Sequence, residues 1–341
     1  MTQVTEKTAL IIGATGSFGA HAAIALLKRG WRIRGLTRDP AAAAIKAGAS
    51  TPIEWFKGDA MSPGDVARAS RGVDLIVHAA NPPGYRNWKG LAWPMLEATI
   101  AAAVSEGARI VLPGNVYNFA PDAGPAIVEN APQSPATRKG AIRVEMEDRL
   151  REATRRGAKA LILRAGDFFG PAAPNSALAW LVRRRGARVS SVLASGPRDV
   201  GHAFAYLPDL AETLGRILER ERELADYEVF HFAGHWLESG DALAASIRRV
   251  TGQPKMPLRP FPWVLVAALS PFVETFRELL EMRYLSRRPI GLSNRKLVAF
   301  LGAEPNTPLD RAVAATLCDM GCLCEDRSGR VEMAAGALAA A

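Results

Sequence analysis

Cysteine, aromatic residues and long apolar runs are all scarce in this chain of 341 residues. Its 3 cysteines, Cys318, Cys322 and Cys324, are spaced C-x3-C-x-C with no histidine nearby, which fits no zinc pattern, so we expect no metal site. The N-terminal residues are polar and lack the apolar core of a signal peptide. The most apolar later stretch, Phe261–Phe272, is too short to span a bilayer. We therefore expect a cytoplasmic protein with no membrane partner.

Positive charge is in excess but is not concentrated. The net charge is +9, and the densest basic clusters, at 155–156, 183–185 and 287–288, are short. They lack the interleaved aromatic residues that binders of single-stranded nucleic acid use, so we expect no nucleic-acid partner. With 48% apolar residues, the chain can bury a large core as one large domain or two unequal ones. An anionic dinucleotide would account for part of the positive charge.

The most informative stretch is a glycine-rich turn near the N-terminus. A short apolar run, Ala9–Ile12, leads into G-A-T-G-S-F-G, and a helical pattern follows over Ala20–Arg29. A strand, a glycine turn and a helix in this order build a pyrophosphate site, because glycines let the backbone approach the phosphates and the helix N-terminus faces the anion. The residues predicted to contact the dinucleotide in this turn are Gly13, Thr15, Gly16, Ser17, Phe18 and Gly19.

Strand-like and helix-like segments alternate through the first half of the chain. Such alternation of short apolar strands with helices predicts an α/β fold with a doubly wound, Rossmann-type parallel sheet. The expected strands are Ala9–Ile12, Trp31–Leu36, Ile53–Lys57, Leu75–His78, Ile110–Leu112 and Leu161–Arg164. The expected helices are Ala20–Arg29, Ala41–Ala47, Pro63–Ala69, Trp93–Glu106 and Thr137–Arg156.

The pattern changes after residue 171, where proline and glycine become frequent and helices dominate. We expect residues 1–171 to form the dinucleotide-binding domain, and we leave open a contribution to its sheet from later residues. Residues 172–330 are expected to form a smaller, mostly helical substrate domain, and 331–341 a flexible tail. The expected later elements are helices over Ser176–Arg185, Leu207–Arg222, Ser239–Thr251, Trp263–Ser286 and Leu309–Met320, and a strand over Tyr227–Ala233.

The glycine spacing, G-x-x-G-x-x-G, resembles that of the short-chain dehydrogenase/reductase superfamily, and most closely its extended and atypical branches. Those branches include the NAD-dependent epimerase/dehydratase group and the NmrA-like group. Three later segments, Leu163–Pro171, Phe204–Ala211 and Leu301–Leu309, resemble the family segments LRPxxxYGP, xVxDxA and LGxxPxTPL in the family's order. The resemblance covers most of the chain, and it implies hydride transfer with a small-molecule substrate. It leaves a homodimer open, because helices near residue 100 pair two sheets in related dimers.

The end of the second strand selects the cofactor in this family. An acidic residue there binds the ribose of NAD, whereas an arginine accommodates the extra phosphate of NADP. Arg38 comes first at this point, so we predict NADP, with NAD as the alternative if Asp39 holds the ribose instead. Asp59 after the third strand is expected to contact adenine, or else to cap the next helix. Small residues after the fourth strand are expected to lie against the dinucleotide, and these are Ala79, Ala80 and Asn81.

The family's catalytic residues are missing from this chain. The resemblance implies a serine or threonine after the fifth strand and a Tyr-x-x-x-Lys pair on the next helix. Here the chain reads Pro113-Gly114-Asn115 at the first place, while Lys139 and Arg143 stand at the tyrosine and lysine positions. Tyr117 lies close to the first place, in a Val-Tyr dipeptide like that of the family.

Three interpretations follow for the chemistry. Lys139 could be a modified acid/base, helped by the like charge of Arg143, while Arg143 binds the nicotinamide ribose. Alternatively, Tyr117 supplies the proton and Asn115 orients the substrate carbonyl. In the third, nothing is catalytic and the cofactor site serves a redox sensor, as in the NmrA-like regulators. A nucleotide-sugar epimerase remains a further alternative, although the serine and the Tyr-x-x-x-Lys pair are absent.

Overall fold

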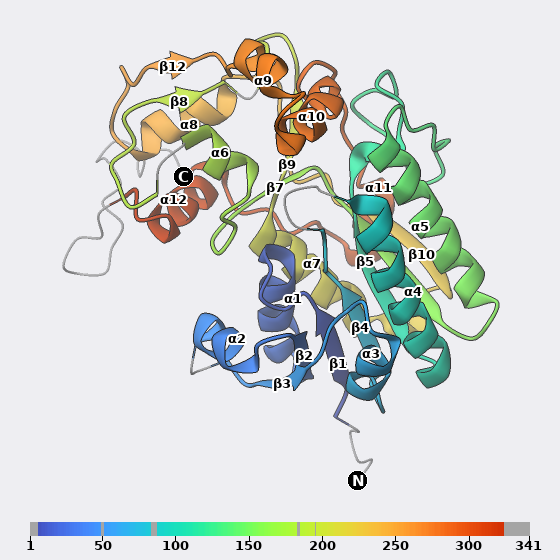
Figure 1. Ribbon diagram of the computed structural model, residues 1–341. Coiled ribbons are helices and arrows are strands. Elements are labelled where there is room, and N and C mark those ends of the chain that lie inside the picture. The colour runs from blue at the N-terminus through green and yellow to red at the C-terminus, as the bar shows by residue number, and fades with distance from the viewer. Residues whose placement is uncertain (1–5, 49–50, 83–86, 183–184, 195, 324–341) are drawn as a thin grey trace.

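The computed structural model describes residues 6–48, 51–82, 87–182, 185–194 and 196–323. Its centre is a seven-stranded parallel sheet with the strand order β10-β6-β5-β4-β1-β2-β3. Figure 1 shows this sheet with helices on both faces. The strands are β1 (Thr8–Ile12), β2 (Arg32–Thr37), β3 (Ile53–Lys57), β4 (Leu75–His78), β5 (Arg109–Gly114), β6 (Lys159–Arg164) and β10 (Tyr227–His231). The predicted doubly wound α/β fold is therefore confirmed.

Two apolar layers cover the sheet, one on each face. On one face, α1 and α7 pack against each other and against side chains such as Ile11 and Leu163. On the other face, α3, α4 and α5 pack on side chains such as Leu10 and Ile110. These helices and α2, which packs against β3, are α1 (Ser17–Leu27), α2 (Pro40–Ala47), α3 (Pro63–Ala69), α4 (Trp88–Glu106), α5 (Arg138–Thr154) and α7 (Leu207–Glu219). Because successive residues of a strand point to opposite faces, burial on both faces requires nearly continuous apolar strands.

The sequence left open whether later residues contribute to the sheet. They do so through strand β10. It pairs in parallel with β6, from Tyr227 opposite Ala160 to His231 opposite Arg164. The helix α7 also returns to the sheet and packs on α1. The chain thus leaves the central sheet after β6, forms part of a second region, and then returns to the central sheet as β10.

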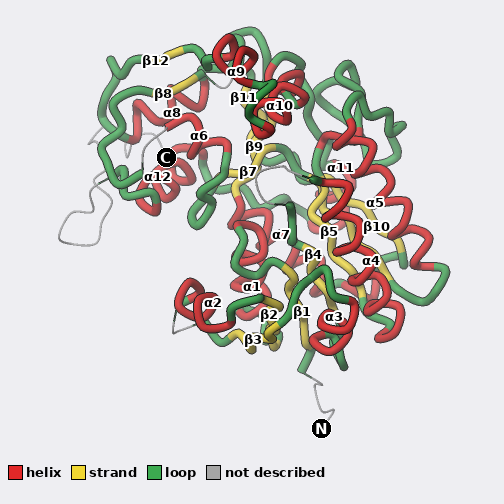
Figure 2. Tube along the Cα trace, in the orientation of Figure 1, coloured by secondary structure: helices red, strands yellow, loops and turns green. Residues whose placement is uncertain are grey.

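The second region is mostly helical and lies above the carboxyl ends of the strands (Figure 2). It has its own apolar core around Phe169, Leu243 and Leu317. Its short strands are β7 (Asp167–Phe169), β8 (Val192–Leu193), β9 (His202–Tyr206), β11 (His235–Leu237) and β12 (Leu258–Arg259). Its helices are α6 (Ala177–Val182), α8 (Ala242–Val250), α9 (Trp263–Leu269), α10 (Glu274–Glu281) and α12 (Leu309–Asp319). The helix α11 (Arg295–Leu301) instead packs against β10, and its Leu297 belongs to the core on the α1 and α7 face of the central sheet.

One expected helix is wrong. The single helix predicted over Trp263–Ser286 is divided into α9, α10 and the 3₁₀ turn Arg283–Ser286. Pro271 lies in the break between α9 and α10, where it cannot donate a backbone hydrogen bond and restricts the residue before it.

Two further expectations from the sequence are about the C-terminal segment and about membrane-spanning helices. The predicted tail, Val331–Ala341, and Cys324 lie outside the described residues. Within the described ranges, no helix combines the length and apolar character needed to cross a membrane.

Candidate functional site

The glycine turn after β1 is shaped by close backbone contacts. Gly13 has a φ of +91°, and a Cβ there would lie 2.8 Å from the backbone of Ala79 and Ala80. Gly16 donates its N–H to the Gly13 carbonyl at 2.9 Å, and α1 begins at the next residue. A Cβ at Gly19 would lie 2.2 Å from the Gly13 oxygen. The turn can therefore lie against the chain after β4 only because Gly13 and Gly19 have no side chain.

The remaining residues predicted in the turn also lie at this edge of the sheet. The Thr15 carbonyl accepts a hydrogen bond from Lys46 Nζ of α2 at 2.7 Å. Ser17 opens α1, and its carbonyl is 2.8 Å from the His21 ring. Phe18 stacks on Phe168 of the second region, with ring centroids 6.4 Å apart. The turn thus connects both regions of the molecule.

Arg38 lies at the end of β2 beside an open, polar hollow of about 720 Å³. Asp59 also lines this hollow, together with Lys57 and Arg68. Arg38 is exposed and makes no hydrogen bond or ion pair within the described ranges. Asp39, by contrast, caps α2, because its Oδ1 accepts the N–H of Ala42 at 3.0 Å. The structure therefore leaves Arg38 available at the position where a cofactor phosphate is expected.

Asp59 is used locally by its own turn. Its Oδ1 accepts the N–H of Met61 at 2.9 Å, and its own N–H is donated to Asp65 at 3.0 Å. The cap of α3 is Ser62, not Asp59. The predicted alternative role for Asp59, as a helix cap, is therefore wrong.

Arg143 connects the ends of two strands. Its guanidinium donates to the carbonyl of Pro113, near the end of β5, at 3.3 Å and to the Oδ1 of Asn81, after β4, at 3.4 Å. It also lies over the Trp88 ring, with 5.0 Å between the guanidinium carbon and the ring centroid. Arg143 is therefore held at the edge of the sheet where Ala79 meets the glycine turn.

Asn115 and Tyr117 form the turn after β5. The Asn115 Oδ1 accepts the backbone N–H of Tyr117 at 3.0 Å, which fixes the orientation of the side-chain amide. The Asn115 carbonyl accepts a hydrogen bond from Arg164 at 2.7 Å. No described residue accepts a hydrogen bond from the Asn115 Nδ2 group. A Cβ at Gly140 would lie 2.2 Å from the Tyr117 carbonyl, so this turn abuts the start of α5.

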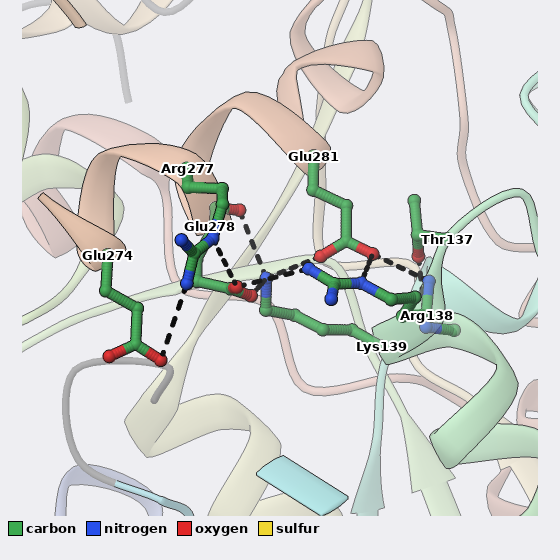
Figure 3. Close-up of polar contacts among 8 residues, drawn as sticks. Thr137, Arg138, Lys139, Glu274, Arg277, Glu278 and Glu281 are labelled. Carbon is green, nitrogen blue, oxygen red and sulfur yellow. Dashed lines mark hydrogen bonds and ion pairs between the residues drawn. The ribbon is translucent and has the colours of Figure 1, made fainter. Parts of the chain in front are cut away.

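Lys139 is buried, with 2% of its side chain exposed, and its ammonium group points away from the sheet toward α10 (Figure 3). It forms ion pairs with Glu278 and with Glu281, the latter at 3.0 Å, and donates to the Glu278 carbonyl at 3.1 Å. An ammonium has three N–H donors, and these carbonyl and carboxylate oxygens of α10 lie within reach of them. Arg138 adds a backbone hydrogen bond to Glu281 at 2.6 Å. Helices α5 and α10 are therefore joined by a buried cluster of charges.

The environment of Lys139 differs from the one expected from the sequence. One interpretation of the sequence made Arg143 the neighbour that tunes Lys139, but the structure gives the two side chains different partners, Pro113 and Asn81 for Arg143 and α10 for Lys139. Glu278 and Glu281 were missed. Their i, i+3 spacing on a helix was visible, but nothing in the sequence connected them to a residue so distant along the chain.

Burial and charge shift the pKa of several groups near this edge. Burial would raise the pKa of Glu281, but the hydrogen bond and charge of Lys139, aided by Arg138, lower it. Burial and the charge of Arg143 lower the pKa of His78 to about 3. His78 Nδ1 contacts Thr99 Oγ1 at 2.8 Å, so this histidine is packed within the sheet. Among the residues that the structure describes, no cluster of histidine, cysteine and acidic side chains could hold a metal.

The sequence model of the NAD dependent epimerase/dehydratase family matches residues 9–233. The chain belongs to this family. The match begins in β1 and ends just after β10, so it covers the whole central sheet except its first residue. The glycine turn, Arg38, Asn115 and Lys139 all lie within the part that defines the family, whereas Glu278 and Glu281 lie outside it.

The curated relatives of this chain align with only a part of it. The sterol-4-alpha-carboxylate 3-dehydrogenases (decarboxylating) of Bos taurus and Mus musculus are each 33% identical to it over 86 residues. That match covers 25% of this chain and 22% of each relative. The chain therefore spans about a fifth of the length of these relatives.

Solved structures with a similar fold align with nearly the whole chain. One is UDP-glucose 4-epimerase from Bifidobacterium longum in complex with NAD+ and UDP, with a TM-score of 0.72, 15% identity, and coverage of 95% of this chain and 100% of the other. Another is a putative epimerase from Burkholderia cenocepacia J2315, with a TM-score of 0.73, 18% identity, and coverage of 92% and 98%. At these identities the likeness shows the shared fold.

Proposed function

We propose that this protein is an NADP-dependent oxidoreductase that moves hydride between the nicotinamide and the carbon of a small carbonyl or alcohol substrate. The observation that carries the choice of cofactor is the position of Arg38. Arg38 directly follows β2 and lines an open hollow, where no described residue forms a hydrogen bond or ion pair with it. Asp39, by contrast, caps α2. A guanidinium binds phosphate through two parallel hydrogen bonds, so Arg38 suits the additional phosphate of NADP.

The backbone around the glycine turn fits a dinucleotide. The turn has no room for a Cβ at Gly13 or Gly19, and the first N–H groups of α1 have no partner within the helix. Those N–H groups and the helix dipole would hold the pyrophosphate. Arg143, at the edge formed by Pro113 and Asn81, would hold the nicotinamide ribose. When bound, the nicotinamide supplies or accepts the hydride.

The chain's own residues would position the substrate oxygen and move the proton. Asn115 has its Oδ1 fixed by the Tyr117 N–H, so its Nδ2 is oriented to donate to a carbonyl oxygen. We assign the proton to the Tyr117 hydroxyl, which would protonate the substrate oxygen in reduction and accept its proton in oxidation. Lys139 donates its hydrogens to Glu278 and Glu281, so its acid/base role would require this cluster to open.

The engagement of Lys139 favours a second candidate function. If neither Lys139 nor Tyr117 moves a proton, the same site would bind NADP as a redox sensor without turnover, as in the NmrA-like regulators. Nucleotide-sugar epimerisation is a third candidate, supported by the names of structural neighbours that include UDP-glucose 4-epimerase. The missing serine and Tyr-x-x-x-Lys pair argue against it.

Calorimetric titration with NADPH and NADH tests the proposed cofactor. We expect NADPH to bind more tightly, and Arg38→Glu to weaken NADPH binding by about 100-fold, because it removes a charged hydrogen-bonding partner and adds a repulsive charge. NADH binding should change little. Arg71→Glu, on the turn after α3, is a charge-matched control outside the lining of the polar hollow. Equal affinities of the wild type for the two cofactors would reject NADP as the preferred one.

Turnover decides between the enzyme and the sensor. NADPH oxidation should be followed with a panel of aliphatic ketones, aldehydes, a 3-ketosteroid and UDP-glucose. Tyr117→Phe is expected to lower kcat by 100-fold or more, within the usual range for removing a general acid, and Asn115→Ala by about 10-fold or more. If kcat is unchanged in Tyr117→Phe, Tyr117 is not the proton donor. Tight NADPH binding without turnover of any compound would support the sensor instead.

A further inference from the structure

The second region contains an open hollow whose lining is almost entirely apolar. Its volume is about 420 Å³, and it lies between α6, α9, α10 and the segment after β7. Of its 11 lining residues, 10 are proline, alanine, leucine, valine, phenylalanine or tryptophan, and the exception is Asn175. Pockets for small molecules typically measure about 300–1,000 Å³ and are mostly apolar with a few polar groups. The size and lining therefore suit the apolar part of a small molecule.

The hollow at Arg38 and the hollow near α10 differ in chemistry. The one at Arg38 has Trp55 and Phe56 in its lining but also three cationic side chains, those of Arg38, Lys57 and Arg68, which can bind a phosphate. The one near α10 offers no charged side chain in its lining. A diphosphate group placed there would lose its hydration without gaining a cation, which is costly. The apolar hollow is therefore unsuited to an anionic group.

The position of α10 connects the apolar hollow with the candidate site. Phe276 and Leu279 of α10 line the hollow, while Glu278 and Glu281 of the same helix contact Lys139. Since successive helical residues are rotated by about 100°, these two pairs lie on nearly opposite faces of α10. Pro174, which also lines the hollow, follows shortly after Phe168, which stacks on Phe18 of the glycine turn. The helix α10 thus lines the hollow with one face and contacts Lys139 with the other.

The hollow opens onto an apolar stretch of surface. Leu265 and Trp180 line it and are 57% and 47% exposed. Beyond them, Val264 and Phe272 are 86% and 85% exposed, and no charged residue occurs between Arg259 and Glu274. Exposed apolar patches on folded proteins mark sites of binding more often than chance would give. An apolar molecule would meet these exposed apolar side chains on its way to the hollow, while the Arg283 guanidinium lies over the Trp263 ring of the same stretch.

We propose that this hollow, between α6, α9 and α10, binds the hydrocarbon part of a lipophilic ketone or alcohol, and so sets the substrate class of the enzyme. The statement that this substrate carries a ketone or alcohol group rests on the proposed function. Binding of the hydrocarbon does not, because it depends only on the lining. Each methylene group buried in such a site should strengthen binding by about fourfold.

Calorimetric titration with 2-butanone, 2-hexanone, 2-octanone and 2-decanone, without cofactor, tests the proposal. We expect the affinity to rise by about fourfold for each added methylene group until the hollow is full. Leu279→Gln should weaken 2-decanone binding by 10-fold or more and flatten the dependence on chain length. Trp180→Ala, at the half-exposed mouth, is a second variant that spares the core and should weaken binding by at least threefold. Val264→Ser, which is exposed and outside the lining, is the matched control and should bind as the wild type does.

Three results would overturn the proposal. One is an affinity that does not depend on chain length. Another is equal weakening by Val264→Ser and Leu279→Gln, which would locate binding on the outer surface. The third is binding of UDP-glucose that Leu279→Gln weakens, which would assign the hollow to a nucleotide sugar. Titration with NADPH in the same samples separates this inference from the proposed function, since alkanone binding without NADPH binding would reject only the latter.

Discussion

The two ends of the candidate site are built in different ways. At the cofactor end, the turn from Gly13 to Gly19 and the chain at Ala79 meet through backbone contacts, and substitution by any larger residue meets the main chain. At the other end, Lys139 meets Glu278 and Glu281 through long side chains from helices far apart in the sequence. The first arrangement depends on the absence of side chains, and the second depends on their charges. They should therefore respond to different changes: to added volume at one end, and to pH and lost charge at the other.

Removing the cation beside Glu278 and Glu281 should have the largest effect on stability. Lys139→Met leaves two partly buried carboxylates next to each other, so we expect the free energy of unfolding to fall by about 2 kcal/mol, which is less than for a fully buried pair. Urea denaturation at pH 7 measures this. Adding Glu278→Gln and Glu281→Gln to Lys139→Met should restore part of the loss, because the unpaired charges disappear.

A surface ion pair provides the control for this prediction. Arg155 and Glu152 form an i, i+3 pair that is largely exposed. Arg155→Met should cost less than about 1 kcal/mol, because water screens such pairs. If Lys139→Met costs no more than Arg155→Met, the buried cluster does not hold α5 to α10 as the structure indicates.

At the cofactor end, volume should matter more than charge. Gly13→Ala introduces a Cβ 2.8 Å from the backbone of Ala79 and Ala80, so the turn must move, and we expect NADPH binding to weaken by about 100-fold. Gly30→Ala is a matched control, because Gly30 also has a positive φ but has nothing within 4 Å of its added Cβ. It should lower stability by about 1 kcal/mol and leave the affinity for NADPH unchanged. Similar losses of affinity in both variants would show that strain, and not close approach, limits the turn.

The sequence predicted the cofactor end better than the other end for a physical reason. The glycine turn, the strands and the small residues after β4 are local patterns, each readable within a few residues. The membership of β10 in the sheet was left open, and the break near Pro271 was missed although proline signals it. The pairing of Lys139 with Glu278 and Glu281 requires two helices to be docked, and charge patterns along one helix do not identify the partner helix. Local backbone chemistry was therefore predictable, and contacts between distant side chains were not.

Glu281, one of the two partners of Lys139, should respond to pH. The pKa of Glu281 is lowered from its ordinary value of 4.5, so its contribution to stability is complete above that pH and is lost as the pH falls through its native pKa. Glu281→Gln should flatten the fall in stability below pH 4.5, by about 1 kcal/mol. Unfolding by urea at several pH values between 3 and 7 would measure the slope. An unchanged acid slope in Glu281→Gln would mean that other carboxyl groups cause the loss.

The smallest effect is expected at His202, the first residue of β9. Its Nε2 is 2.8 Å from Asp167 Oδ2 and its Nδ1 is 3.2 Å from the Leu285 carbonyl, so only the protonated ring can donate at both positions. Burial lowers the pKa of His202, but the hydrogen bond and charge of Asp167 raise it above its ordinary value overall. The resulting stability is complete below pH 6.5 and is lost as the pH rises through the raised native pKa.

His202→Gln should therefore remove a decline in stability above pH 6.5 that the wild type shows, worth about 1 kcal/mol. Thermal unfolding followed from pH 6 to pH 9 measures it. His21→Gln is the control, because burial lowers the pKa of His21, so its titration causes no decline in stability above pH 6.5. A decline that persists in His202→Gln would place the titrating group elsewhere, and the contact of His202 with Asp167 would then contribute to packing alone.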